Sequence, residues 1–184
     1  MLKTIVSNNC AGGAILHDLG MEFLTPTINL QILPEDYHVF CKYFDHYIKE
    51  EIKEYKNISP WHQEILKRMF GGVPDIPFGI LDDILVVFQH YATFEEGANK
   101  WKERAERIKD IKIDEIGFIF HARGPEYKTT AERFLQLDLP HKLCLTQSFE
   151  IPGSVSFEGE GFSVVDNKLL ITQVYDFKSW RDKE

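Results

Sequence analysis

Apolar residues in the first third of the chain fall into short runs that alternate between strand and helix patterns. Residues 2–6 are apolar and predict a short buried strand, and residues 14–20 predict a short helix. Residues 27–33 are β-branched and apolar, as in a strand. Pro34 then marks a helix start, because apolar and aromatic residues recur at helical spacing through residues 37–54.

The middle of the chain contains one segment rich in breakers and one strongly apolar run. Residues 57–79 hold several prolines and a Gly-Gly pair around one predicted helix at 61–70, a composition typical of a lid or an insertion. Residues 78–88 contain ILVVF, which predicts a central parallel strand covered on both faces. Thr93, with a glutamate three residues later, predicts the N-cap of the next helix.

The last third repeats the alternation of strand and helix. Residues 115–121 predict a strand, residues 130–137 a helix and residues 142–146 another strand. Residues 154–174 suggest an antiparallel edge, with SVSF and FSVV flanking EGEG as a hairpin. The pattern predicts a three-layer α/β/α fold of Rossmann-like type, with a largely parallel or mixed sheet.

Composition bounds the number of domains and the location of the protein. A chain of 184 residues with 43% hydrophobic and 27% charged residues is expected to form one domain, residues 1–184, with the insertion or lid at 57–79. No apolar run approaches the roughly 20 residues of a membrane span. The amino terminus turns polar too early for a signal peptide. We therefore expect a cytoplasmic protein without a transmembrane segment.

Charge and cysteine usage narrow the classes of partner. A net charge of −8 opposes binding to nucleic acid, because that affinity comes largely from lysine and arginine. The three cysteines, Cys10, Cys41 and Cys144, are widely spaced and odd in number. They fit reduced thiols better than a disulfide framework or a zinc site.

The turn SNNCAGG, between the first predicted strand and helix, is the densest candidate for a substrate-binding site. Open α/β sheets usually bind ligands at this position. Its side chains and glycines could contact a phosphate or a carbonyl group. The spacing matches neither GxGxxG nor GxxxxGK[ST], so no phosphate motif is present. The candidate residues are Ser7, Asn8, Asn9, Gly12 and Gly13.

Residues in and near this turn, and Arg123 after the strand at 115–121, have alternative interpretations. Cys10 is a candidate nucleophile, but a packed structural thiol is the favoured interpretation. Asn8 and Asn9 could equally stabilise the turn by bonding to the backbone. Arg123 could hold an anion with two hydrogen bonds, although surface arginines often have no such role, and His121 is a weaker signal.

Asp82, Asp83 and His90 complete the catalytic candidates. The adjacent carboxylates could hold magnesium or manganese beside a nucleotide sugar, although at most one would face a given site on a strand. A helix-capping or ion-pair role explains them at least as well. His90 could act as a general base. It would lie on the order of 20 Å from the carboxylates along an extended strand, too far for a dyad. We expect one of the carboxylates to share a pocket with the SNNCAGG turn.

Several segments resemble one bacterial family. SNNCAGGAILHDLG, FLTPTINL, GILDDILVVFQHYATFEEGANKWKER, LPHKLCLTQ and VYDFKSW are similar to domain-of-unknown-function family 1919, which is associated with exopolysaccharide and capsule biosynthesis. The resemblance covers nearly the whole chain. It implies an α/β transferase acting on nucleotide-sugar or lipid-linked glycan intermediates, and it brings no established catalytic residues. Ala11 and the loop HARG depart from the family pattern.

The expected function is a transferase in exopolysaccharide biosynthesis, with glycosyl transfer from a nucleotide sugar preferred. One alternative is a polysaccharide O-acyltransferase or O-acetyltransferase using acetyl coenzyme A, but HxxxxD and hexapeptide repeats are missing. The other is a non-catalytic binding or assembly protein of the polysaccharide machinery. That protein would dock on other polysaccharide-assembly proteins through exposed aromatics, namely Trp61, Phe70 and Trp180.

Overall fold

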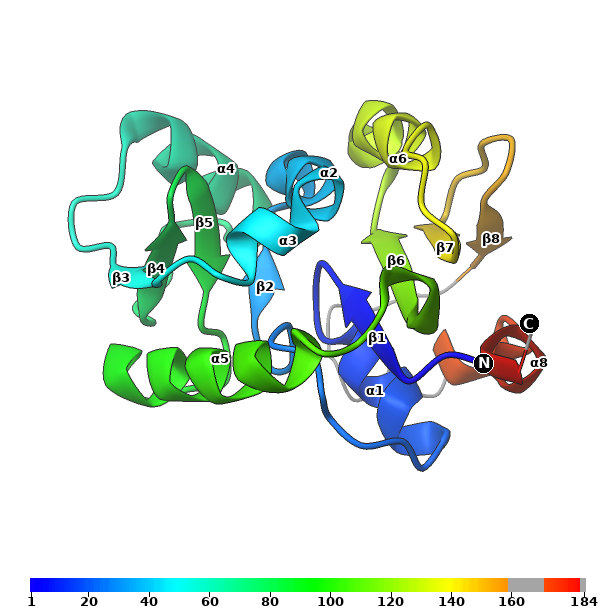
Figure 1. Cartoon of the computed structure of the whole chain (residues 1–184). Helices are drawn as coiled ribbons and strands as arrows, with labels where there is room; N and C mark the ends of the chain where they lie inside the picture. The colour runs from blue at the N-terminus through cyan, green and yellow to red at the C-terminus, as the bar shows by residue number, and fades with distance from the viewer. Residues whose placement is uncertain (159–170, 183–184) are drawn as a thin grey trace.

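Two four-stranded sheets form the framework of the computed structural model, which describes residues 1–158 and 171–182 (Figure 1). The first sheet is parallel throughout, in the order β1-β6-β7-β8. Its strands are β1 (Thr4–Ser7), β6 (Ile116–Ala122), β7 (Lys142–Gln147) and β8 (Val155–Phe157). The second sheet is antiparallel, in the order β2-β5-β4-β3. Its strands are β2 (Gln31–Ile32), β5 (Ile84–Val87), β4 (Phe78–Leu81) and β3 (Lys53–Glu54).

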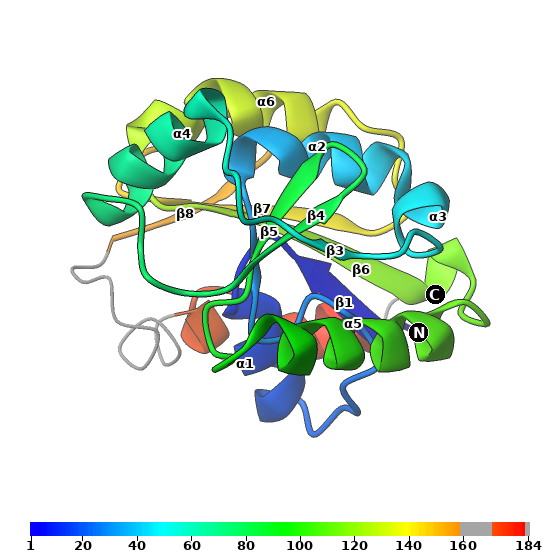
Figure 2. The same ribbon diagram turned by 90° about the vertical axis from the view of Figure 1, so that its left-hand side faces the viewer.

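Helices cover the sheets on two sides. Figure 2 shows α2, α4 and α6 on one side of the sheets and α1, α5 and α8 on the other. This layering confirms the three-layer α/β class, with a parallel sheet joined by a smaller antiparallel one. The helices are α1 (Ala11–Asp18), α2 (Pro34–Lys42), α3 (Phe44–Tyr47), α4 (Pro60–Phe70), α5 (Phe94–Ile108), α6 (Lys128–Leu135) and α8 (Phe177–Asp182).

One continuous core joins the two sheets. Phe118 and Phe120 of β6 belong to the same buried cluster as Val86 of β5 and the adjacent Phe88. Burial of this shared apolar surface stabilises both sheets at once. Cooperative unfolding of the chain as one unit stays a prediction. Among the described residues, no helix combines the length and the apolar composition that a membrane span needs.

The apolar run at residues 78–88 is a hairpin and not one central parallel strand. β4 and β5 pair antiparallel, with Leu81 opposite Ile84, and the turn between them consists of Asp82 and Asp83. Asp82 has a φ of 55°, the left-handed conformation that aspartate tolerates better than most residues. Both strands are almost fully buried, so their sequence resembles that of a central parallel strand.

Two other elements are shorter than the sequence predicts. The long helix expected through residues 37–54 is broken at Tyr43, whose φ of −114° and ψ of 36° are not helical, and α3 follows as a separate short turn. The strand expected at residues 27–33 is reduced to β2, because Thr27 turns back to bond Thr25 and Asn29 has a positive φ. In both places local backbone turns override the apolar pattern.

The predicted antiparallel edge at residues 154–174 is also different. β8 pairs with β7 in parallel, in continuation of the first sheet. The whole returning strand FSVV and all of EGEG except Glu158 lie outside the described residues.

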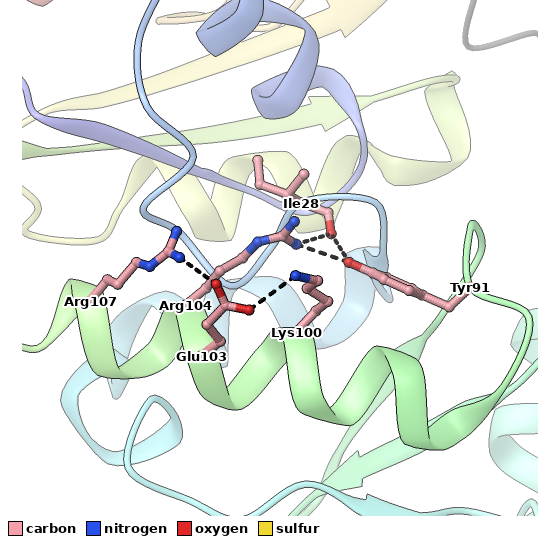
Figure 3. Close-up of polar contacts among 6 residues, drawn as sticks. All are labelled: Ile28, Tyr91, Lys100, Glu103, Arg104 and Arg107. Carbon is pink, nitrogen blue, oxygen red and sulfur yellow. Dashed lines mark hydrogen bonds and ion pairs between the residues drawn. The ribbon is translucent and has the colours of Figure 1, made fainter.

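Helix α5 is fastened to the loop before β2 by one arginine. Arg104 donates to the carbonyl oxygen of Ile28 at 3.2 Å and to the hydroxyl of Tyr91 at 2.9 Å (Figure 3). Tyr91 also donates to the Ile28 carbonyl, at 3.2 Å. Arg107, one turn further along α5, pairs with the exposed Glu103 and with no other side chain of residues 1–158 and 171–182. Arg104 therefore connects α5 with the loop at Ile28 and the segment at Tyr91, whereas Arg107 forms an ion pair on the surface of its own helix.

We expect Arg104→Met to lower the free energy of unfolding by about 1–2 kcal/mol, because the carbonyl of the buried Ile28 and the hydroxyl of the half-buried Tyr91 lose a charged donor. Arg107→Met removes the same charge from the same helix and should lower it much less, because its ion pair is exposed. Urea unfolding of both variants measures the difference. Equal losses would show that Arg104 does not fasten the loop.

Candidate functional site

The carboxyl ends of β1 and β6 are locked together by the side chain of Asn8. Its Oδ1 accepts a hydrogen bond from the backbone N–H of His121 at 2.9 Å, and its Nδ2 donates to the His121 carbonyl at 3.2 Å. Asn8 is fully buried, and its own carbonyl accepts from Ile32 of β2 at 2.9 Å. One amide thus extends the pairing of two parallel strands, and its backbone connects them to the second sheet.

The rest of the SNNCAGG turn is largely occupied by its own hydrogen bonds. Ala11 N–H donates to Asn9 Oδ1 at 3.0 Å, and Gly12 N–H donates to Ser7 Oγ at 3.0 Å. A Cβ at Gly12 would lie 2.4 Å from Ser7 Oγ, so glycine is required by this close approach. Gly13 has ordinary space beside Ile28. The turn therefore satisfies its own first helical amides, which leaves its side chains to position the neighbouring strand end.

His121 has a fixed tautomer in this arrangement. Because Asn9 Oδ1 accepts from Ala11, Asn9 Nδ2 must face the His121 ring, where it lies 3.3 Å from Nδ1. Nδ1 is then the acceptor and the proton is on Nε2. Burial, followed by the charge of Arg123, lowers the pKa of His121 to about 3, and a hydrogen bond with Gln147 opposes this shift only in part. His121 is therefore neutral near neutral pH.

A small cavity of about 90 Å³ opens at these strand ends. It lies between the end of the parallel sheet, the start of α2, the end of α4 and the turn Pro125–Tyr127 that precedes α6. Open α/β sheets bind ligands at this edge because their loops converge there. The polar side chains that line the cavity include Asn8, Asn9, Gln31, Arg68, Arg123 and Glu126.

Arg123 is the cationic group of the cavity that lacks a compensating partner. Its Nε is buried and has no hydrogen-bond partner, and no carboxylate of the described residues forms an ion pair with it. Burial lowers the pKa of Arg123, although an arginine keeps its charge in proteins. The Arg123 residue as a whole is half-buried, and a cationic group that is partly removed from water is costly unless an anion accompanies it. The cavity is thus suited to an anionic ligand, as the sequence suggests for this residue.

Tyr127 contributes a protonated hydroxyl to the same cavity. Burial, then the negative charges of Glu35 and Glu126, raise its pKa to about 12, while Arg68 and Arg123 act in the opposite direction. Arg68 forms an ion pair with Glu35 across the gap between α4 and α2. No local pattern signals Arg68 or Glu35, because they lie 33 residues apart and only the packing of two helices brings them together.

Cys10 is a packed thiol next to Asn9, which lines the cavity. It is 7% exposed, and burial raises its pKa to about 11, so the thiolate is scarce at neutral pH. The charge of Arg123 lowers that pKa only in part. The turn positions Cys10 without activating it.

We expect Cys10→Ser to lower the free energy of unfolding by about 1 kcal/mol and to leave ligand binding within about twofold of the wild type. Ellman's reagent should label none of the three buried cysteines in the folded protein and all of them in guanidinium. Rapid labelling of one thiol in the folded wild type, lost in the Cys10→Ser variant, would point to a reactive nucleophile instead.

The other catalytic candidates lie elsewhere. Asp83 accepts a hydrogen bond from the Tyr47 hydroxyl at 2.8 Å, and Asp82 lies 3.5 Å from His46 Nε2, both at the β4–β5 turn. His90 is exposed after β5. The residues that line the cavity include Asn8 and Asn9 but none of these three. The structure therefore does not bring either carboxylate into one pocket with the SNNCAGG turn.

No group of three His, Cys, Asp or Glu side chains is arranged to hold a metal ion in the described parts of the chain. A larger hollow, of about 550 Å³, lies between α5 and residues 48–52. Its rim carries both lysines and glutamates, and none of the candidate residues lines it. We therefore place the candidate site at the smaller cavity, where buried polar groups and the unpaired Arg123 meet.

These features define a three-layer α/β protein with a small crevice at the carboxyl ends of β1 and β6 that contains the arginine Arg123. The chain belongs to the family of the domain of unknown function DUF1919, whose pattern matches residues 2–183. It is 24% identical over 181 residues to an uncharacterized protein of Haemophilus influenzae, a match that covers 98% of this chain and 78% of that protein.

Proposed function

We propose that this protein is a transferase of exopolysaccharide biosynthesis that transfers a sugar from a nucleotide sugar, with the donor's phosphate bound by Arg123. The observation that carries the proposal is the uncompensated guanidinium in a cavity at the carboxyl ends of parallel strands. A phosphate oxygen accepts hydrogen bonds from arginine in the planar geometry that the guanidinium presents.

The size of the cavity limits which part of the donor it holds. Sites that enclose a whole small molecule have volumes of about 300–1,000 Å³. The cavity at Arg123 measures about 90 Å³ and therefore fits the phosphate portion alone. The nucleoside and the sugar would extend over the surrounding surface. Tyr127 and Asn9 are further donors at the cavity for phosphate oxygens.

The chemistry of glycosyl transfer explains why an arginine is useful there. The bond between the sugar's anomeric carbon and the phosphate oxygen breaks, and the acceptor hydroxyl forms a new bond to that carbon as it loses its proton. The leaving nucleotide gains negative charge during this step. A fixed guanidinium beside the phosphate stabilises that charge. Magnesium or manganese would be bound mainly through the phosphates of the donor. The proposal also includes a cytoplasmic location, which the free cysteines favour.

The two alternatives have less support in the structure. Cys10 is a neutral buried thiol, so acyl transfer through a cysteine lacks an activated nucleophile. The assembly alternative relied on three exposed aromatics. Trp61 is 61% exposed, but Phe70 is half-buried and Trp180 is 5% exposed, so these residues do not form an exposed aromatic set.

A thermal-shift panel of nucleotide sugars, acyl donors and divalent ions tests the proposal. A ligand at a hundred times its Kd stabilises the folded state by about 2.7 kcal/mol. We expect at least one nucleotide sugar to do so, and Arg123→Met to abolish the effect. Arg133→Met, at an exposed position of α6, is the matched control and should retain it. Transfer of the labelled sugar to a glycan acceptor is the functional readout.

The proposal fails if no nucleotide sugar shifts the melting temperature, or if Arg123→Met binds the donor as well as Arg133→Met does. Stabilisation by an acyl donor alone would favour the O-acyltransferase. Parallel measurements with magnesium, manganese and EDTA establish whether a divalent ion takes part.

A further inference from the structure

Arg68 is a second arginine at the cavity that contains Arg123. It belongs to the last turn of α4, beside Met69 and Phe70, and lines the cavity with them. Its guanidinium bonds the side chain of Glu35 on α2. The Arg68 side chain is 52% exposed, so it can change partner without repacking the core. The Arg68 side of this ion pair is exposed to solvent, and ion pairs that solvent reaches contribute little to folding stability.

Glu35 has a stabilising environment of its own. It lies in the first turn of α2, where the helix dipole favours a negative charge. Its Oε1 pairs with Arg68, while its Oε2 is buried and has no hydrogen bond within the described residues. Loss of Arg68 would therefore leave a carboxylate that the helix end still stabilises. An anion that binds arginine more strongly than the Glu35 carboxylate does can therefore replace Glu35 as the partner of Arg68.

We propose that the cavity selects a diphosphate, in which Arg123 holds one phosphate and Arg68 leaves Glu35 to hold the other. The inference rests on the proposed function, because it specifies which part of the nucleotide sugar is recognised. A single phosphate binds to Arg123 alone, so it does not compete with Glu35 for Arg68. A second phosphate offers Arg68 two charged oxygens in place of one carboxylate.

The charges around Tyr127 support this arrangement. Glu35 and Glu126 raise the pKa of its hydroxyl, and Arg68 and Arg123 lower it, so all four charged groups lie near enough to this lining residue to affect it. With Arg68 turned inward, two arginines face the single carboxylate of Glu126 among the lining residues. The lining then carries a net positive charge, which a diphosphate compensates.

Isothermal titration calorimetry of the full chain with inorganic pyrophosphate and inorganic phosphate, both in EDTA, tests the inference. We expect the wild type to bind pyrophosphate at least about tenfold more tightly than phosphate. Arg68→Met should bring the two affinities within about twofold of each other while phosphate binding is retained. Glu35→Gln should tighten pyrophosphate binding about threefold or more, because the competing charge is removed while the shape is kept. Arg123→Met should lose both ligands.

Lys67→Met is the matched control, because it removes one positive charge from the same turn at an exposed position outside the cavity. It should keep the preference for pyrophosphate. A preference that survives in Arg68→Met, or pyrophosphate binding that weakens in Glu35→Gln, would overturn the inference. If Arg68→Met fails to fold, the Glu35→Gln result decides. If the protein prefers pyrophosphate as expected but transfers no sugar, the diphosphate site stands and the proposed transferase function is wrong.

Discussion

Replacing Asn8 by aspartate should lower the free energy of unfolding by about 3–5 kcal/mol at pH 7.5, the largest effect we expect from a single substitution. The Asn8 amide donates to the His121 carbonyl and accepts from the His121 N–H at a fully buried position. A carboxylate of the same shape keeps the acceptor and turns the donor into a second acceptor. Its second oxygen would then face the carbonyl oxygen of His121, and its charge would be buried with the His121 N–H as its hydrogen-bond donor.

The pH dependence of this variant distinguishes buried charge from lost packing. Burial raises the folded-state pKa of the introduced carboxyl, so the loss should be small below pH 4 and grow as the pH rises. A protonated carboxyl can donate to the His121 carbonyl and restores part of the pairing. Asn8→Ala removes both hydrogen bonds without a charge and should lose about 2–3 kcal/mol at every pH. Urea unfolding at several pH values checks both. A pH-independent loss in Asn8→Asp would show that charge is not the cause.

The parallel sheet can be predicted from sequence because its strands are short apolar runs next to clear helices. The runs at 2–6, 115–121 and 142–146 all form strands of that sheet within two residues of their expected bounds. The prediction for the run at 78–88 is wrong, because apolar residues on both faces occur in any fully buried strand. The pair Asp82-Asp83 is the available turn signal, and its carboxylates are equally compatible with a role in chemistry.

The candidate site is predictable only where its residues follow a strand. Asn8, Asn9 and Arg123 come directly after β1 and β6, so a reader of the sequence can place them at one edge of the sheet. Arg68 and Glu35 enter the cavity region because α4 packs beside α2, and no local pattern reports that packing. The sequence leaves the role of Asn8 open between turn and ligand, and its two bonds to His121 show a structural role.

Asp36 is expected to make the stability of the protein fall as the pH rises. Its side chain is 19% exposed, in the first turn of α2 next to Glu35. Burial, then the charge of Glu35, raise its pKa to about 7 against a backbone hydrogen bond from Leu85. His62 Nε2 lies 4.0 Å away, but burial lowers the pKa of that imidazole, so it offers little compensating charge.

The sign follows from the two states of the carboxyl. The folded protein keeps a proton on Asp36 up to about pH 7, whereas the unfolded chain releases it near pH 4. The contribution of Asp36 is therefore fully favourable below pH 4 and is lost as the pH rises through 7. The variant Asp36→Asn has no ionisable group at this position, and its amide keeps the size and the acceptor for the Leu85 N–H.

We therefore expect Asp36→Asn to gain about 2–3 kcal/mol of unfolding free energy relative to the wild type between pH 5 and pH 8.5. Urea unfolding at the two pH values measures this difference, and Asp45→Asn, at an exposed position of α3, controls for the change in net charge. Parallel pH profiles for wild type and Asp36→Asn would contradict the raised pKa. Glu35 directly precedes Asp36 and pairs with Arg68. If the raised pKa of Asp36 is confirmed, pyrophosphate binding in Asp36→Asn should therefore depend less on pH than in the wild type.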